Sequence, residues 1–83
     1  MINSKTISYP FTPGDLQLKV AYTGNYPLYI GRARPGALSS AAEWQICKIT
    51  YDSNNNVTAI QWAGGTNDYS NVWDDRATAY VYS

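Results

Sequence analysis

Alternation of apolar and polar residues with a period of two is the feature that most constrains how this 83-residue chain can fold. The pattern is clearest over residues 16–22, where every second residue is large and apolar: Leu16, Leu18, Val20 and Tyr22. A period of two is typical of a strand, because successive side chains of an extended chain point to opposite faces. The sequence contains no heptad pattern, long amphipathic helix or internal repeat, so it predicts β-structure.

Further extended segments are separated by residues that favour turns. We expect them at residues 7–11, 27–31, 43–51, 57–63 and 77–82. Residues 37–42 fit either one helical turn or a loop of small residues, and residues 52–56 fit a hairpin connection. The chain is therefore expected to form one small, mostly antiparallel all-β domain over residues 1–83, a sandwich or partly open barrel of about five or six strands.

The central hairpin is expected to supply the core. Because the sequence has a single Phe and a single Met, tryptophan must fill much of the interior. The expected core residues are Trp44, Ile46, Ile60 and Trp62. Cys47 lies between them in the sequence and has no histidine or basic cluster to lower its pKa, so we expect a buried, unreactive thiol.

Composition argues against several classes of function. The chain has no histidine, which removes the most common general base and metal ligand. Six basic residues balance six acidic ones, so neither nucleic acid nor an anionic membrane surface is expected as a partner. Residues 52–56 open like a calcium loop, but Val57 and Ala63 stand where Gly and Glu are required. We expect no enzyme, no metal and no cofactor.

Tyrosine and arginine are the candidate contact residues, because both are common in protein interfaces. The chain has eight Tyr, too many for a small core. The candidates for protein contacts are Tyr26, Tyr29, Arg32, Arg34, Tyr80 and Tyr82. A second group is expected to fix a loop, with one carboxylate capping a turn and the other pairing with an arginine: Trp73, Asp74, Asp75 and Arg76.

The sequence contains five short motifs: Tyr-Ile-Gly at 29–31, Pro-Gly at 35–36, Trp-Gln-Ile at 44–46, Trp-Ala-x-Gly at 62–65 and Trp-Asp-Asp-Arg at 73–76. Together they resemble small β-rich modules of tailed bacteriophages. The resemblance covers residues 28–82 and leaves residues 1–27 as a variable N-terminal part. It implies a virion-associated protein, synthesised in the host cytoplasm, and it implies no catalytic residues.

The expected function is that of a non-enzymatic structural component of a phage particle, in capsid decoration or in the tail or head–tail region. Its expected partners are further copies of itself and other virion proteins. Two alternatives remain at this point. One is a carbohydrate-binding module for host attachment that uses Trp73 and Tyr69, and the other is a small phage protein that inhibits a host target.

Overall fold

The computed structural model describes residues 15–83. The strand expected at residues 7–11 and the turn expected at residues 12–14 lie outside this part of the chain.

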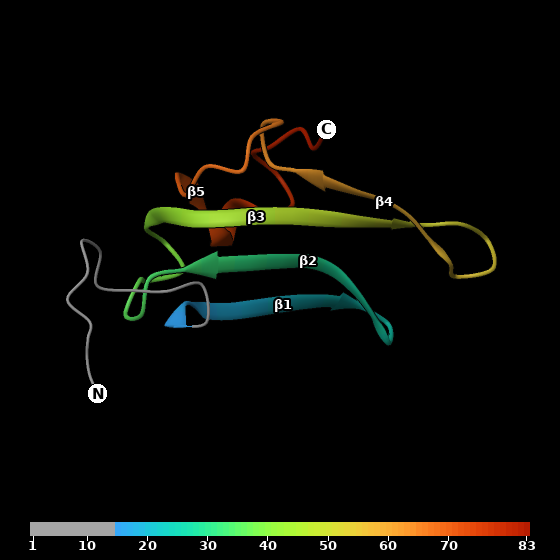
Figure 1. The fold of residues 1–83 in the computed structure, drawn as a ribbon, viewed down its shortest axis with the longest axis horizontal. Helices are drawn as coiled ribbons and strands as arrows, with labels where there is room; N and C mark the ends of the chain where they lie inside the picture. The colour runs from blue at the N-terminus through green and yellow to red at the C-terminus, as the bar shows by residue number, and fades with distance from the viewer. Residues whose placement is uncertain (1–14) are drawn as a thin grey trace.

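Five antiparallel strands form the sheet (Figure 1). They are β1 (Gln17–Thr23), β2 (Tyr26–Ala33), β3 (Ala42–Tyr51), β4 (Val57–Trp62) and β5 (Asn71–Val72). The first four lie side by side in chain order, and β5 also pairs with β3. Within residues 15–83 no pairing joins β1 to β4, so the sheet is open. The predicted antiparallel all-β fold is confirmed, in the form of one unclosed sheet.

β4 and β5 return along β3 one after the other. β4 pairs with the second half of β3, from Cys47 to Tyr51, and β5 pairs with its beginning, from Ala42 to Trp44. The loop over residues 64–70 separates them, and Gly64 and Gly65 both have positive φ there. After β5 comes the 3₁₀ helix η2 (Trp73–Asp75), so this loop decides where the C-terminal residues meet the sheet.

Two local expectations change. The predicted strand at residues 77–82 is wrong apart from one bridge between Ala63 and Tyr82. The backbone carbonyl of Asp75 accepts hydrogen bonds from the N–H groups of Thr78 and Ala79, which keeps the chain turned there. Residues 37–41 form a loop with turns, as one of the two options for residues 37–42 predicted, and Ala42 already belongs to β3.

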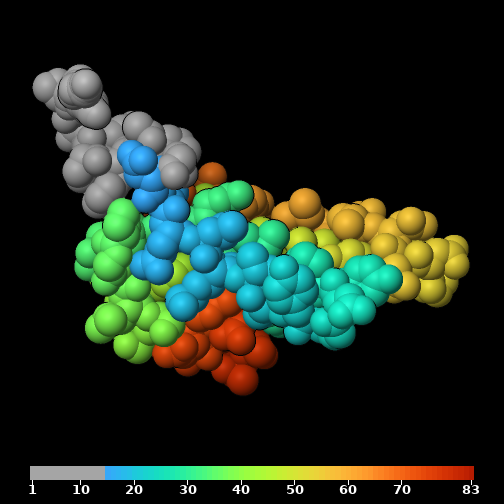
Figure 2. Space-filling view, turned by 90° about the horizontal axis from the view of Figure 1, so that it is seen from below, coloured from blue at the N-terminus to red at the C-terminus, as the bar shows by residue number. Residues whose placement is uncertain are grey.

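The core lies on one side of the sheet. Trp44 and Ile46 are fully buried, which confirms their prediction as core residues. Ile60 is 56% exposed, so its assignment to the core is wrong, and Trp62 is only half-buried. Ile60 and Trp62 pair with Ile49 and Cys47 of β3, and paired residues of neighbouring strands lie on the same face of a sheet. Because Cys47 and Ile49 lie on the face opposite to that of Trp44 and Ile46, Ile60 and Trp62 also point away from the core. Figure 2 shows the C-terminal residues, in red, gathered on one side of the sheet.

Candidate functional site

The covered face of the sheet, which carries Tyr29, Gly31, Ala33, Trp44 and Ile46, is closed by Trp73 of η2. The rings of Trp44 and Trp73 lie 5.8 Å apart, centroid to centroid. Gly31 leaves the space for Trp73, because a Cβ atom at Gly31 would lie 2.6 Å from the ring. Trp73 is 6% exposed, so the stacking platform required for the carbohydrate-binding alternative is not formed by this residue.

The C-terminal residues hold this loop in place. The Arg76 guanidinium lies 4.6 Å above the Trp73 ring centroid, and its Nη1 donates to the Trp73 carbonyl. The Tyr82 hydroxyl donates to the Arg76 carbonyl at 2.9 Å, and the Tyr80 hydroxyl accepts from the Val72 N–H at 2.7 Å. The expectation that Trp73 and Arg76 fix the loop agrees with these contacts.

Three of the expected contact tyrosines belong to the interior instead. Tyr29 is 9% exposed, and its ring lies 5.5 Å from that of Tyr82. Tyr80 and Tyr82 are partly buried against the same cluster. The hydroxyl groups of Tyr80 and Tyr82 are used within the chain and Tyr29 is buried, so the prediction of these three residues as contact residues is replaced by a structural role.

Asp74 and Asp75 fix the loop through their backbone. The Asp74 N–H donates to the Ser39 carbonyl at 3.1 Å, and the Asp75 carbonyl accepts the two N–H groups described above. Both side chains are exposed, and within residues 15–83 the ion pair that the structure contains is Arg34 with Glu43. The expected pairing of these aspartates with an arginine is therefore absent from the described residues.

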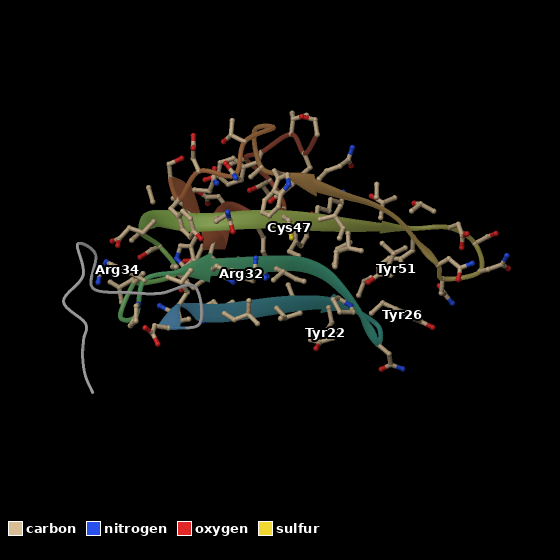
Figure 3. The ribbon with its side chains drawn as sticks, in the orientation of Figure 1. Tyr22, Tyr26, Arg32, Arg34, Cys47 and Tyr51 are labelled. Atoms are coloured by element: carbon tan, nitrogen blue, oxygen red, sulfur yellow. The ribbon has the colours of Figure 1, made fainter. Side chains whose placement is uncertain are left out.

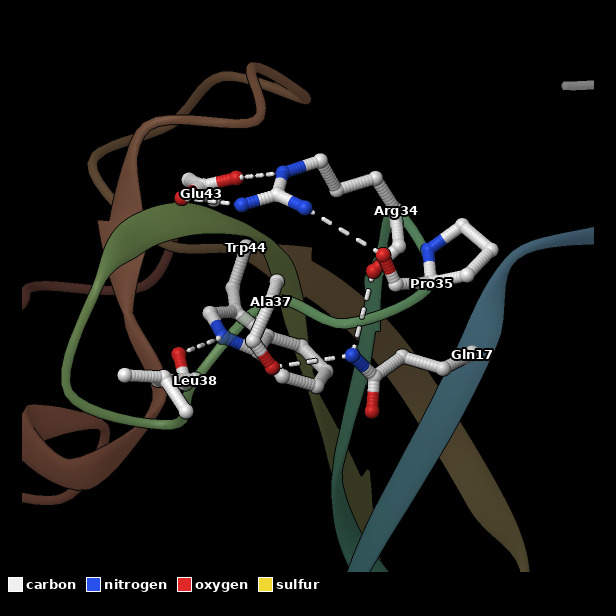
Figure 4. A network of polar contacts seen from close by, with 7 residues as sticks. All are labelled: Gln17, Arg34, Pro35, Ala37, Leu38, Glu43 and Trp44. Carbon is white, nitrogen blue, oxygen red and sulfur yellow. Dashed lines mark hydrogen bonds and ion pairs between the residues drawn. The ribbon is translucent and has the colours of Figure 1, made fainter. Parts of the chain in front are cut away.

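Arg34 is engaged at the end of β2, where Figure 4 shows its contacts. Its Nε and Nη2 both donate to the Glu43 carboxylate, which raises the Arg34 pKa through the hydrogen bond first and the charge second. Beside it, Gln17 Nε2 donates to the carbonyls of Arg34 and Ala37, which joins β1 to the loop after β2. Arg34 is thus used to hold this corner, and it is less available to a partner than the sequence predicts.

The opposite side of the sheet is apolar and is here called the open face. It is defined by Leu18, Val20, Ile30, Arg32, Gln45, Cys47, Ile49, Ile60 and Trp62. The strand register arranges these residues in rows. The central row, Val20–Ile30–Cys47–Trp62, crosses all four long strands. On its two sides lie the rows Leu18–Arg32–Gln45 and Ile49–Ile60.

Much of the open face is in contact with solvent. Leu18 is 57% exposed and Ile60 is 56% exposed, at opposite edges of the sheet. Val20, Ile30 and Trp62 are half-buried, whereas Cys47 and Ile49 are shielded by their neighbours in the middle of the sheet. None of the residues in the core cluster of the described chain comes from this face. A contiguous exposed patch of aliphatic side chains marks an interaction site more often than scattered apolar residues do.

Arg32 is the one charged residue of the open face, in the row at the end nearest Arg34 (Figure 3). It is exposed, and within residues 15–83 its guanidinium group makes no hydrogen bond or ion pair. It thus remains a candidate contact residue. It lies near Cys47, whose thiol pKa is raised because burial outweighs the opposing effects of backbone hydrogen bonds and of the Arg32 charge. The expectation that the Cys47 thiol is buried agrees with this placement.

At the other end of the sheet, Tyr26 packs with Tyr51, and Figure 3 shows both beside Tyr22. The rings of Tyr26 and Tyr51 lie 5.6 Å apart, and the Tyr51 hydroxyl donates to the Pro27 carbonyl at 2.5 Å. Tyr51 bridges β2 and β3 beyond the point where their pairing ends, at Tyr29 and Lys48. Tyr26 is 41% exposed, which leaves it available for the contact role expected of it.

Other kinds of site receive no support from these residues. The described part of the chain contains no group of three or more side chains suited to a metal ion. It also contains no helix of the length and apolar character needed to cross a membrane. Comparison with protein-family models, curated proteins and solved structures gives no match for this chain.

Sequence reasoning missed the open face because it assigned aliphatic residues to the core and sought contacts among tyrosines. A signal was present. Residues 44–51 alternate Trp44 and Ile46 with Cys47 and Ile49, so that strand is apolar on both sides. A chain of this length has few residues to cover two apolar faces.

Proposed function

We propose that this protein is a non-catalytic structural component that acts through protein contacts made by its open face. The observation that carries the proposal is the exposure of Leu18 and Ile60, together with half-buried Trp62, on a sheet face that contributes no residue to the core cluster of the described chain. An apolar sheet face gains free energy when a second layer of protein covers it. The protein is thus one half of a layered structure whose other half is another protein surface.

Composition supports a role without catalysis. The whole chain lacks histidine, and its charged residues are 14% of the total, below the roughly 25% of an ordinary domain. A surface with few charges loses little hydration when it is packed against protein. These properties favour a protein that packs against several other proteins within an assembly.

The free edge of β1 is a second surface suited to assembly. Within residues 15–83, β1 pairs with β2 and nothing pairs with its outer side. Unpaired N–H and C=O groups on an edge strand can accept a strand from another chain. This edge borders the open face at Leu18 and Val20, so one partner can use both surfaces.

The assembly that we propose is a bacteriophage particle. The support for this choice is the resemblance of residues 28–82 to phage modules. Two of the motifs that carry this resemblance also have packing roles in the fold. The Trp73–Arg76 motif closes the core, and Gly31 of the Tyr-Ile-Gly motif makes room for it.

Quantitative mass spectrometry of purified particles of the virus that encodes the chain tests this proposal. The expected result is the protein at a fixed copy number, with hundreds of copies indicating decoration of the capsid and about six or twelve indicating a tail or neck component. Absence from the particle would overturn the phage-structural function.

A photo-crosslinking residue placed at position 60, with one at position 38 as the matched control, identifies the contact surface. Both Ile60 and Leu38 are exposed and apolar, but only Ile60 belongs to the open face. We expect cross-links to protein from position 60 and few from position 38. Equal yields from the two positions would contradict a role for the open face.

A further inference from the structure

We infer that the open face pairs with the open face of a second copy of this chain, about a two-fold axis that crosses the strands at the centre of the face. This inference rests on the proposed function and names the occupant of the surface. The paired sheets would form a two-layer β-sandwich, with the layers about 10 Å apart.

Charge complementarity selects this arrangement. Arg32 lies at one end of the open face, in the row that contains Gln45 of β3. Asp52 follows Tyr51 at the other end of the same strand, and its carboxylate is exposed. An axis that crosses the strands reverses their direction while it keeps each strand opposite its own copy. When the axis passes between the Cys47 and Ile49 rows, midway between Gln45 and Tyr51, Arg32 of each copy lies over the Tyr51 end of the other, next to Asp52.

Hydrogen bonds within the turn stabilise the ionised form of the Asp52 carboxylate. Its Oδ1 accepts from the N–H groups of Asn54 and Asn56 at 2.8 and 2.9 Å. These bonds lower its pKa, with the Asn56 bond contributing most. Because Arg32 has no ion partner among the described residues, two such pairs at the rim would compensate the one cation on each face.

A two-fold axis along the strands would be less favourable. It would place the end with Arg32 over the same end of the second copy and bring the two guanidinium groups together. The Glu43 carboxylate near that end is already bound by Arg34. Like charges that face each other across an interface oppose association.

The size of the face predicts how strong the dimer is. Four strands spaced about 4.8 Å apart and about six residues long between Gln45 and Tyr51 cover about 400 Å². Two such faces bury about 800 Å², roughly half of a standard interface of about 1,600 Å². We therefore expect a weak dimer, with a Kd on the order of 10–100 µM, which forms readily where many copies are held together.

Sedimentation velocity of the full chain over a range of concentrations tests the inference. We expect the wild type to pass from monomer to dimer, and Ile60→Lys to weaken dimerisation by about 30-fold or more. Leu38→Lys is the matched control, because Leu38 is 70% exposed and lies off the open face, and it should dimerise like the wild type. Circular dichroism should show that all variants remain folded.

A charge exchange tests the orientation. Arg32→Glu and Asp52→Lys should each weaken the dimer, and the double variant should recover most of the loss. A second readout is the fluorescence of Trp62, which should shift to shorter wavelength as the dimer forms, whereas Trp44 and Trp73 are already buried. A double variant as weak as the sum of the single changes would overturn this two-fold arrangement.

A wild type that stays monomeric at about 1 mM would overturn the second copy as occupant. Dimerisation of Ile60→Lys with the affinity of the wild type would do the same. Neither result would affect the particle measurement described above, which can still show the protein in a virion through contacts with a different protein. Failure of the dimer and failure of the proposed function are thus separate outcomes.

Discussion

Gly31 is the residue on which the closing of the core depends. It lies in β2 between Ile30 and Arg32, at the position where the Trp73 ring contacts the sheet. A methyl group here would collide with a ring that is itself packed against Trp44 and cannot move freely. The need for glycine at this point is steric and concerns a residue far away in the sequence.

We predict that Gly31→Ala destabilises the protein by about 2–3 kcal/mol, because the added Cβ overpacks the core. Chemical denaturation followed by tryptophan fluorescence measures the loss. Gly24→Ala is the control: Gly24 has a positive φ but open space around its Cβ position, so its cost is about 1 kcal/mol. Equal losses for the two variants would contradict the steric explanation.

Because of Tyr82, the free energy of unfolding depends on pH in the alkaline range. Burial raises the Tyr82 pKa from 10.0 to about 12, with smaller contributions from Tyr29 and Tyr80. The neutral phenol is the form that the fold favours, so its contribution is complete below pH 10 and is lost as pH rises towards 12. Ionisation also removes the O–H that donates to the Arg76 carbonyl.

We therefore predict that the free energy of unfolding falls between pH 10 and pH 12, and that it falls less steeply in Tyr82→Phe. At neutral pH this variant should lose about 1 kcal/mol with its hydrogen bond. Urea titrations at several pH values provide the measurement. Tyr69→Phe, at an exposed position, should keep the slope of the wild type.

At the scale of elements, the β3–β4 hairpin is specified locally. Asp52 accepts the two N–H groups of the turn, and Asn55 adopts a positive φ of 63°. Asn tolerates this conformation better than other side chains, and Gly tolerates it best. The turn fixes the register of two strands that contribute half of the open face.

Asn55→Gly should preserve or slightly increase stability, whereas Asn55→Ala should cost about 1 kcal/mol because Ala is strained at positive φ. Thermal unfolding by circular dichroism compares the two. If Ala proved as stable as Gly, the left-handed conformation would not be what selects Asn at this position.

Because of Asp52, the stability of the hairpin depends on pH in the acidic range. The Asp52 pKa is lowered from 3.8, so the charged form stabilises the fold above that value, and the contribution is lost as pH falls below it. We predict that Asp52→Asn, which retains an oxygen to accept the turn bonds, shows a smaller loss of stability on acidification. Denaturation midpoints measured down to about pH 2 test this, and a slope equal to that of the wild type would contradict it.

At the scale of the whole molecule, the core cluster of residues 15–83 lies on one side of the sheet only. The C-terminal residues and η2 form a layer on one face (Figure 2), and we propose that a partner protein forms the layer on the open face. The stability of such a protein is linked to its association, since a bound partner stabilises the folded state.

We predict that the melting temperature of the wild type rises by about 5 °C over a hundredfold increase in concentration and that the melting temperature of Ile60→Lys does not rise. Differential scanning calorimetry is the appropriate measurement. A melting temperature of the wild type that is independent of concentration would show that folding and dimerisation are not coupled.

The sequence alone determined the strands of the meander and the turn between β3 and β4. Alternation placed Trp44 and Ile46 on one face of β3 and Cys47 and Ile49 on the other. The Asp and Asn residues of the turn stabilise the turn through hydrogen bonds between residues a few positions apart. These features depend on neighbours along the chain, so they can be predicted from local chemistry. The C-terminal strand could not be excluded this way, because the contacts that replace it are made with distant residues.

Only the tertiary structure decided which apolar face is core. Alternation assigns residues to two sides but does not say which side will be covered. The covered side is the one on which Trp73 packs against Gly31, more than forty positions earlier in the chain, with Tyr80 and Tyr82 packed beside it. Tyr29 lies on this side and is buried, whereas Ile60 lies on the other side and is exposed, because one short C-terminal segment can cover only one side of an open sheet.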